Sequence, residues 1–224
     1  MEILPNVHII PNAVSNQYLL IDPDGLTLID AGMPGSHRKA LSYLAGLGYK
    51  PEDLKRILIT HADFDHIGGL AALKAATGAH IFASPVEAQA MAEGHASRPL
   101  NPRNRITKWF FDLSARLFKP APVQADELLS DGQILPVLGG LRVIETPGHT
   151  PGHLSFFAPS AGVLFCGDSI VSEETGLRGS RGANNWDQVK SDESVQKQAA
   201  LGARILCSGH GPVVMDAERK FPQV

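Results

Sequence analysis

The sequence from residue 56 to residue 69 reads Arg-Ile-Leu-Ile-Thr-His-Ala-Asp-Phe-Asp-His-Ile-Gly-Gly. It starts as a short apolar run, typical of a strand buried on both faces, and then places four potential metal ligands within six positions. These ligands are His61, Asp63, Asp65 and His66. Imidazoles and carboxylates packed so closely favour a cation that neutralises the acids and accepts the imidazole lone pairs. Taken alone, so short a motif has an alternative interpretation to a metal site: a solvated acidic loop with incidental histidines.

Three later segments repeat this arrangement of an apolar run followed by a potential ligand. His149 follows an expected strand at 141–145, Asp168 follows one at 163–166, and His210 follows one at 204–207. Each of the three ligands has a glycine beside it, which lets the backbone turn tightly. Because binding groups of layered α/β folds collect at strand ends, four such ends indicate one shared site.

The rest of the chain alternates expected strands and helices, which predicts an α/β fold in a single domain over residues 1–224. Ser36 is expected to cap a helix at 37–47. A proline-bracketed stretch at about 94–122 is expected to form a helical insert, in which Trp109–Phe111 forms a lid, packs on the domain or makes a dimer contact. The other expected elements are strands at 7–10, 17–21, 26–29, 56–60, 79–83, 133–137 and 154–157, and helices at 67–77, 85–92 and 186–201.

Composition narrows the class of protein and its partners. The 224 residues are 43% hydrophobic and 19% charged, with a formal charge of -3, which is ordinary for a globular domain. This charge excludes electrostatic capture of nucleic acid or of an anionic membrane, so we expect a small-molecule substrate. The sequence leaves the oligomeric state open and is compatible with a dimer. Two cysteines and the lack of a charged, apolar leader favour the cytoplasm.

Five motifs together resemble those of the metallo-β-lactamase superfamily, which includes glyoxalase II and metal-dependent lactonases. Besides the stretch quoted above, they are Ile-Asp-Ala-Gly at 29–32, Thr-Pro-Gly-His-Thr-Pro-Gly-His at 146–153, Phe-Cys-Gly-Asp at 165–168 and Ser-Gly-His-Gly-Pro at 208–212. They occur in the family's order and span nearly the whole chain. The resemblance implies a four-layer αββα sandwich with a metal site at one edge.

The resemblance also implies a ligand set and a reaction. Two divalent metal ions are expected, with zinc first. A metal-bridging hydroxide would attack an ester, thioester, lactone or similar acyl bond, with Asp65 and Asp168 as catalytic residues and either Asp65 or a metal-bound water returning a proton to the leaving group. The implied ligands are His61, Asp63 and His149 for one ion, Asp65, His66 and His210 for the other, and Asp168 as the bridge.

Asp63 departs from the family pattern, which most often has a histidine there. The usual set opposes two carboxylates and a hydroxide to two divalent cations and leaves one positive charge, whereas three carboxylates leave none. We therefore expect a weaker Lewis acid, less attraction for anionic substrates, and iron or manganese as alternatives to zinc. Asp63 also keeps a second function open, a non-hydrolytic iron-dependent redox or oxygen- or thiol-oxidising protein. A metal-retaining binding protein without turnover ranks last.

Several further residues have both a functional and an ordinary structural interpretation. His153 is expected to form hydrogen bonds rather than bind metal, and Asp30 to orient the ligand loop. Cys166 and Cys207 are expected to be buried strand-end residues. Residues 184–186, Asn-Asn-Trp, are candidates for the pocket wall. Glyoxalase II activity itself is disfavoured because the chain ends soon after His210, β-lactamase activity because no export signal is visible, and phosphodiester cleavage because a basic surface is missing.

Overall fold

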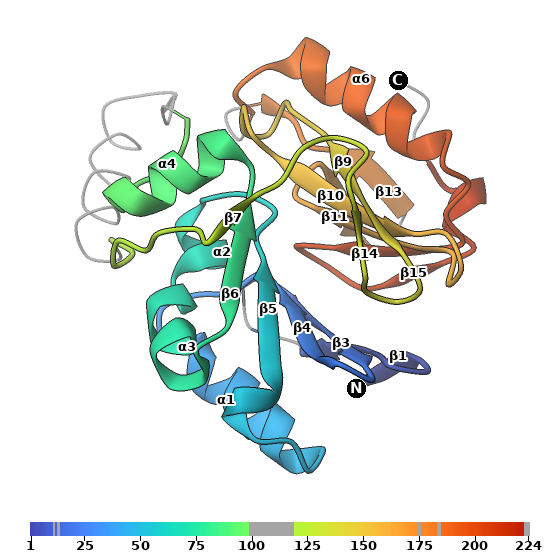
Figure 1. Cartoon of the computed structure of the whole chain (residues 1–224). Helices are drawn as coiled ribbons and strands as arrows, with labels where there is room; N and C mark the ends of the chain where they lie inside the picture. The colour runs from blue at the N-terminus through green and yellow to red at the C-terminus, as the bar shows by residue number, and fades with distance from the viewer. Residues whose placement is uncertain (11, 13, 99–118, 174–175, 183–184, 222–224) are drawn as a thin grey trace.

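The computed structural model describes residues 1–10, 12, 14–98, 119–173, 176–182 and 185–221, and places them in two facing sheets (Figure 1). The first sheet pairs antiparallel from β1 to β4 and parallel from β4 to β7. Its order is β1 (Glu2–Leu4), β2 (Val7–Ile10), β3 (Gln17–Asp22), β4 (Gly25–Ile29), β5 (Leu54–Leu58), β6 (His80–Ala83) and β7 (Glu127–Leu128). Its helices are α1 (Ser36–Gly46), α2 (Phe64–Ile67), α3 (Leu70–Thr77) and α4 (Pro85–Glu93).

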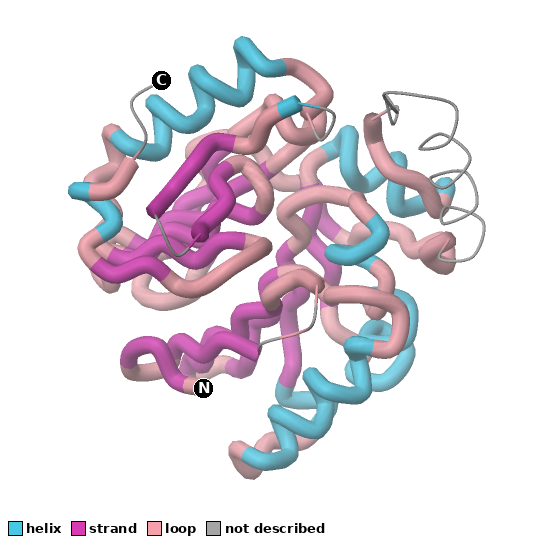
Figure 2. The backbone as a smooth tube through the Cα atoms, turned by 180° about the vertical axis from the view of Figure 1, so that it is seen from behind, coloured by secondary structure: helices cyan, strands magenta, loops and turns pink. Residues whose placement is uncertain are grey.

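The second sheet is antiparallel except where β11 and β14 run parallel. Its order is β15 (Val214–Met215), β14 (Ile205–Ser208), β11 (Val163–Gly167), β10 (Leu154–Ala158), β9 (Leu141–Glu145) and β8 (Ile134–Leu135). A hairpin of β12 (Ile170–Glu173) and β13 (Gly176–Gly179) adjoins it, and α6 (Gln188–Ala199) covers its outer face (Figures 1 and 2). Pro51–Asp53 and Ala217–Arg219 are short 3-10 helices.

Alternating side chains of the strands define the layers. In β3, Leu19 packs into the core between the first sheet and its helices, whereas Leu20 packs into the core between the two sheets. In β11, Phe165 joins the same central core, whereas Leu164 packs beneath α6 with Val195. Because successive strand residues point to opposite faces, three cores separate four layers. This confirms the predicted αββα sandwich.

The predicted elements were found with local corrections. Ser36 begins α1, but Gly35 takes the N-cap position with φ of 93° and no side-chain cap bond forms, so the predicted serine cap was wrong. The helix expected at 67–77 is interrupted at Gly68 and Gly69, where a Cβ on Gly69 would lie 2.4 Å from the Ala31 carbonyl oxygen. The strand expected at 133–137 is only Ile134–Leu135.

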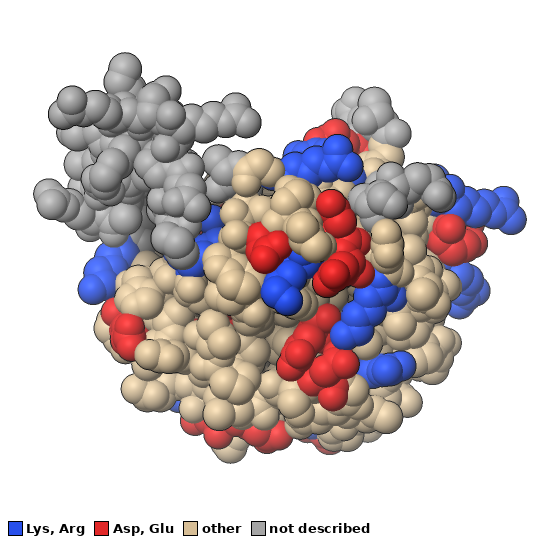
Figure 3. Space-filling model, turned by 90° about the horizontal axis from the view of Figure 1, so that it is seen from above, with Lys and Arg blue, Asp and Glu red and all other residues tan. Residues whose placement is uncertain are grey.

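The segment expected at 94–122 as a helical insert lies largely outside the described residues, as does its Trp109–Phe111 cluster. Its described flanks, 94–98 and 119–122, form turns, bends and irregular chain. In the described part of the chain, no helix is long and apolar enough to cross a membrane. Figure 3 shows basic and acidic side chains interspersed among neutral ones on the face seen from above.

Candidate metal centre

The seven residues predicted as metal ligands come together where strand ends of the two sheets face each other. Loops after β5, β9, β11 and β14 carry five of them, and the other two, Asp65 and His66, lie in the short helix α2 that follows the β5 loop. Three sets have ligand atoms within 4.8 Å of one another, and every predicted ligand belongs to at least one set. We call His61, Asp63 and His149 the first ligand group, and Asp65, His66 and His210 the second ligand group; the remaining set is His61, His66 and Asp168.

Both ligand groups have the dimensions of a metal ion's ligand shell. In the first group, Asp63 Oδ2 lies 3.2 Å from His149 Nε2 and 3.8 Å from His61 Nε2. In the second, Asp65 Oδ2 lies 3.3 Å from the Nε2 of His210. Ligand atoms bound tetrahedrally at about 2.0–2.1 Å lie roughly 3.3–3.4 Å from one another. The spacing therefore fits one ion in each group.

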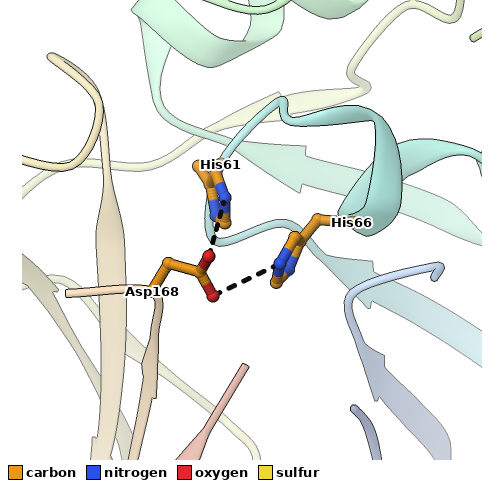
Figure 4. A group of neighbouring side chains, drawn as sticks. All are labelled: His61, His66 and Asp168. Carbon is orange, nitrogen blue, oxygen red and sulfur yellow. Dashed lines mark ion pairs between the residues drawn. The ribbon is translucent and has the colours of Figure 1, made fainter. Parts of the chain in front are cut away.

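Asp168 lies between the two ligand groups. Its Oδ1 is 3.3 Å from His66 Nε2, and its Oδ2 is 3.2 Å from His210 Nε2 and 3.6 Å from His149 Nε2. Figure 4 shows the Asp168 carboxylate opposite the His61 and His66 imidazoles, with one oxygen turned toward each. A single carboxylate thus contacts imidazoles of both groups.

The second ligand group is oriented by strong hydrogen-bond acceptors. His66 Nδ1 lies 2.8 Å from Asp30 Oδ2, and His210 Nδ1 lies 2.6 Å from the Val14 carbonyl oxygen. A carboxylate and a carbonyl only accept hydrogen bonds, so both Nδ1 atoms carry the proton and donate it. The two Nε2 atoms consequently face the centre, where a bound metal would take their lone pairs in place of a proton. Asp30 orients the ring, as expected.

The first ligand group is oriented by hydroxyl groups instead. Thr60 donates its hydroxyl to Asp30 Oδ2 at 2.8 Å, so Thr60 Oγ1 accepts from His61 Nδ1 at 2.9 Å. His149 Nδ1 lies 3.1 Å from Ser180 Oγ. All four imidazoles therefore turn Nε2 toward the carboxylates and Nδ1 outward. Outward Nδ1–H bonds to protein acceptors are typical of metal-binding histidines.

Several buried polar atoms at this centre have no hydrogen-bond partner. Among the described residues they include Nε2 of His61, Nε2 of His66, Oδ1 of Asp63 and Oδ1 of Asp168. Each unsatisfied buried donor or acceptor costs about 1–3 kcal/mol, and more if charged. A divalent cation between them would satisfy imidazole lone pairs and carboxylate oxygens together, so the residues present fit a metal.

The pKa values describe how the site holds protons when no cation is bound. Burial, with the charge on His66, lowers the pKa of His61 well below its usual value. Burial alone would also lower the pKa of His66, but the carboxylates of Asp168 and Asp30 outweigh it and raise that pKa. Burial is the largest single effect on His210 and lowers its pKa, but hydrogen bonds to Asp168 and Asp65 and the charge of Asp168 together outweigh it and raise the pKa to about 10. Metal binding would displace such protons.

Arg98 is a neighbour of the site that sequence reasoning missed. It is buried, and its Nη2 donates to Asp63 Oδ2 at 2.7 Å and lies 3.5 Å from His149 Nε2. A lone arginine 35 residues from its carboxylate partner carries no motif, so the sequence offered no signal.

Glu87 is a second residue that was missed, and it links the loops of the first ligand group. Its carboxylate is fully buried and accepts from the Ala62 N–H at 2.8 Å, the Thr150 hydroxyl at 2.7 Å and the Gly152 N–H at 3.0 Å. Ala62 lies between two ligands of the first group, and Thr150 follows the third. The position of Glu87 in an expected helix gave no hint of these contacts.

The remaining candidates have structural contacts. His153 Nε2 accepts from the Asp168 N–H at 3.1 Å, and burial lowers its pKa to about 3, so a neutral ring supports Asp168 as expected. Cys166 and Cys207 are buried and belong to none of the ligand sets. Asn185 donates to the Ser180 carbonyl at 2.6 Å. Trp186 is 40% exposed, and residue 184 lies outside the described part of the chain.

Comparison with known proteins agrees with this geometry. The family model of the metallo-beta-lactamase superfamily matches residues 11–210. The chain belongs to the metallo-β-lactamase superfamily. The match confirms the family predicted from the motifs.

Individual relatives define the class further. The probable metallo-hydrolase YflN of Bacillus subtilis (strain 168) is 27% identical over 94% of this chain and 85% of its own length. A hydroxyacylglutathione hydrolase of Cereibacter sphaeroides is 32% identical, over 70% of this chain but only 48% of its own. A Cronobacter sakazakii metallo-β-lactamase with a HARLDQ motif has a TM-score of 0.73 and 26% identity, covering 94% of this chain and 77% of that one. The predicted class, a metal-dependent hydrolase of this superfamily, is confirmed.

Proposed function

We propose that this chain hydrolyses an ester, thioester, lactone or similar acyl bond with two divalent metal ions, one in each ligand group. Asp168 would be the ligand shared between them. The observation that carries the proposal is the set of inward-facing Nε2 atoms, two of them buried without a hydrogen-bond partner in the described part of the chain, around a central carboxylate. When bound, the two ions would supply the Lewis acidity that activates a water and polarises the acyl oxygen.

A carboxylate of the chain itself would transfer the proton during hydrolysis. Asp65 is a carboxylate of this centre with a partly accessible side chain, 12% exposed, and its Oδ2 lies 3.3 Å from His210 Nε2. We assign the Asp65 carboxylate to accept the proton of the attacking water and return it to the leaving group. Asp168 is held by its own N–H bond to His153, which fixes the carboxylate between the groups.

The acyl class draws support from the relatives. The Cereibacter sphaeroides relative is named for hydrolysis of a hydroxyacylglutathione, which contains an acyl bond. Because the match covers only about half of that protein, we carry over the kind of bond and not the glutathione group.

Zinc is our first assignment for the metal, with iron or manganese as alternatives. The second ligand group combines two imidazoles and a carboxylate, which suits zinc. Because residue 63 is an aspartate, the first group has the same combination of two imidazoles and a carboxylate. A histidine at this position would give three imidazoles and would favour zinc further. The carboxylate oxygen of Asp63 is a harder ligand than an imidazole nitrogen, so iron and manganese stay as alternatives to zinc.

The test begins with elemental analysis of protein purified without added metal. The protein is then stripped with a chelator, reloaded with zinc, manganese or iron, and assayed on lactone, ester, thioester and phosphodiester panels. We expect about two ions per chain and acyl hydrolysis that returns only on reloading. Near-stoichiometric iron with oxygen consumption and no hydrolysis would favour the redox alternative. A chain that binds no metal under any condition would refute the proposal.

A further inference from the structure

Arg98 occupies a position that distinguishes the two ligand groups. Its side chain is only 5% exposed, and its guanidinium contacts Asp63 and His149, two of the three residues of the first group. The neighbouring residue Ser97 donates its hydroxyl to Glu87 at 2.9 Å, which anchors this stretch of chain after α4. The arginine is therefore held against the first group by a fixed backbone.

We propose that Arg98 is a positioning residue that offsets the charge of Asp63, and that the first ligand group consequently binds its divalent ion more weakly than the second. The inference rests on the proposed function only in assuming that both groups bind metal. It concerns the order and strength of metal binding at the two groups.

The charge balance gives the first step. With Asp63 in place of a histidine, three carboxylates and a hydroxide would leave two divalent ions with no net charge. An arginine stays protonated in proteins, so Arg98 returns one positive charge, and the Asp63–Arg98 pair is as neutral as the imidazole that it replaces. The count of zero made from the ligands alone did not include this arginine. The site keeps the net charge of the commoner ligand set.

The same guanidinium makes the two groups unequal. It lies 2.7 Å from Asp63 Oδ2, the carboxylate oxygen that also faces the two imidazoles, so an ion bound there would have a fixed positive neighbour. In the second group, the ion pairs of Asp65 within the described chain are to His66 and His210 alone. Repulsion between like charges therefore acts more strongly on an ion in the first group, which contacts Arg98, than on one in the second.

The hydrogen bonds behind the imidazoles act in the same direction. A carboxylate and a carbonyl hold the histidines of the second group, whereas hydroxyls of Thr60 and Ser180 hold those of the first. Stronger acceptors on Nδ1 raise the basicity of Nε2 and fix the ring. Two independent features thus predict that the second group fills first.

The experiment is a calorimetric titration of the metal-stripped full chain with zinc chloride. We expect two separated binding events in the wild type, with His149→Ala removing the weaker event and His210→Ala removing the tighter one. Arg98→Gln should strengthen the weaker event at least about tenfold and narrow the separation. Arg98→Lys, which keeps the charge, should preserve the separation. Arg178→Gln, which removes an exposed arginine paired with Glu173, is the matched control and should leave both events unchanged.

A second pair of variants tests the coupling to Asp63. Asp63→His leaves Arg98 as a buried cation without its carboxylate, so it should lower the melting temperature and weaken the first group. Asp63→His combined with Arg98→Gln should recover both losses, because the charge and its partner are removed together.

Three results would overturn the inference. They are an Arg98→Gln titration that matches the wild type, loss of the tighter event in His149→Ala, and a double variant no better than Asp63→His. If Arg98→Gln does not fold, the inference is still tested by which binding event, the weaker or the tighter, is lost in His149→Ala and which in His210→Ala. A wild type that binds none of zinc, manganese and iron would instead refute the proposed function.

Discussion

The two ligand groups have the same types of ligand, two imidazoles and one carboxylate, but the residues around them differ. Behind the second group lie acceptors, Asp30 and the Val14 carbonyl. Beside the first group lies a donor with a full positive charge, Arg98. The ligand list alone would predict two similar sites. By our inference, residues that need not touch a metal set the order in which two such sites fill.

The largest effect is expected at the residue that the two groups share. Asp168→Asn keeps the shape but loses the charge that contacts imidazoles of both groups, so we expect loss of both bound ions and a roughly 10²–10³-fold or greater fall in kcat. The measurement is metal content after dialysis, together with turnover on the best substrate of the panel. His149→Ala and His210→Ala serve as comparisons, each expected to lose one ion. Retention of both ions by Asp168→Asn would show that the groups are independent.

A smaller effect should appear when the acceptors behind the imidazoles are changed. Asp30→Asn removes the carboxylate that accepts from His66 Nδ1, and asparagine tolerates the φ of 60° at this position. We expect a loss of about 10- to 100-fold in the metal affinity of the second group. The first group should lose less, because Asp30 reaches His61 only through the Thr60 hydroxyl. Ser180→Ala removes the hydroxyl behind His149 and should weaken the first group by less, because a hydroxyl is the poorer acceptor.

Zinc titrations of both variants, with thermal unfolding as the control for folding, check this difference. Equal losses for the two variants, or a larger loss for Asp30→Asn in the first group than in the second, would contradict the comparison.

Much of the site could be predicted because its residues follow strands and sit in recognisable motifs. His149 and His210 each follow an apolar run and stand beside a glycine, and this pattern is visible without coordinates. At Gly209 the reason is steric, since a Cβ there would lie 2.2 Å from Asp168 Oδ1. Arg98 and Glu87 could not be found this way. Their partners lie up to 65 residues distant in the chain, and only the packing of the two halves brings them together.

The fold shows the same division between local and tertiary causes. Strands with continuous apolar runs, such as β10 and β11, were found within a residue of their observed ends. The two-residue strands β7 and β15 carry too little pattern to be read, and β8 is shorter than its pattern predicted. The break between α2 and α3 arises because Gly69 packs against the carbonyl of Ala31, a residue in the loop after β4. Local pattern specifies the long elements, and packing decides their ends.

Glu87 offers the finest test, because it supports only the first group. Its Oε2 accepts from Ala62, and its Oε1 accepts from Ser97, Thr150 and Gly152. Glu87→Gln keeps the size, but its amide NH₂ must face at least one of these donors. We expect the free energy of unfolding to fall by about 1–3 kcal/mol. Affinity should fall a few-fold in the first group and stay unchanged in the second.

The control for Glu87→Gln is Glu93→Gln, at the exposed end of the same helix, which should leave stability and metal binding as they are. Urea unfolding measures the first quantity and zinc titration the second. A stability loss shared equally by the two variants would show that the helix, and not the buried carboxylate, is responsible. An equal loss of affinity in both ligand groups would mean that Glu87 supports the whole sheet edge. Selective weakening of the first group would instead show that the loops on either side of Asp63 and His149 are held by this carboxylate.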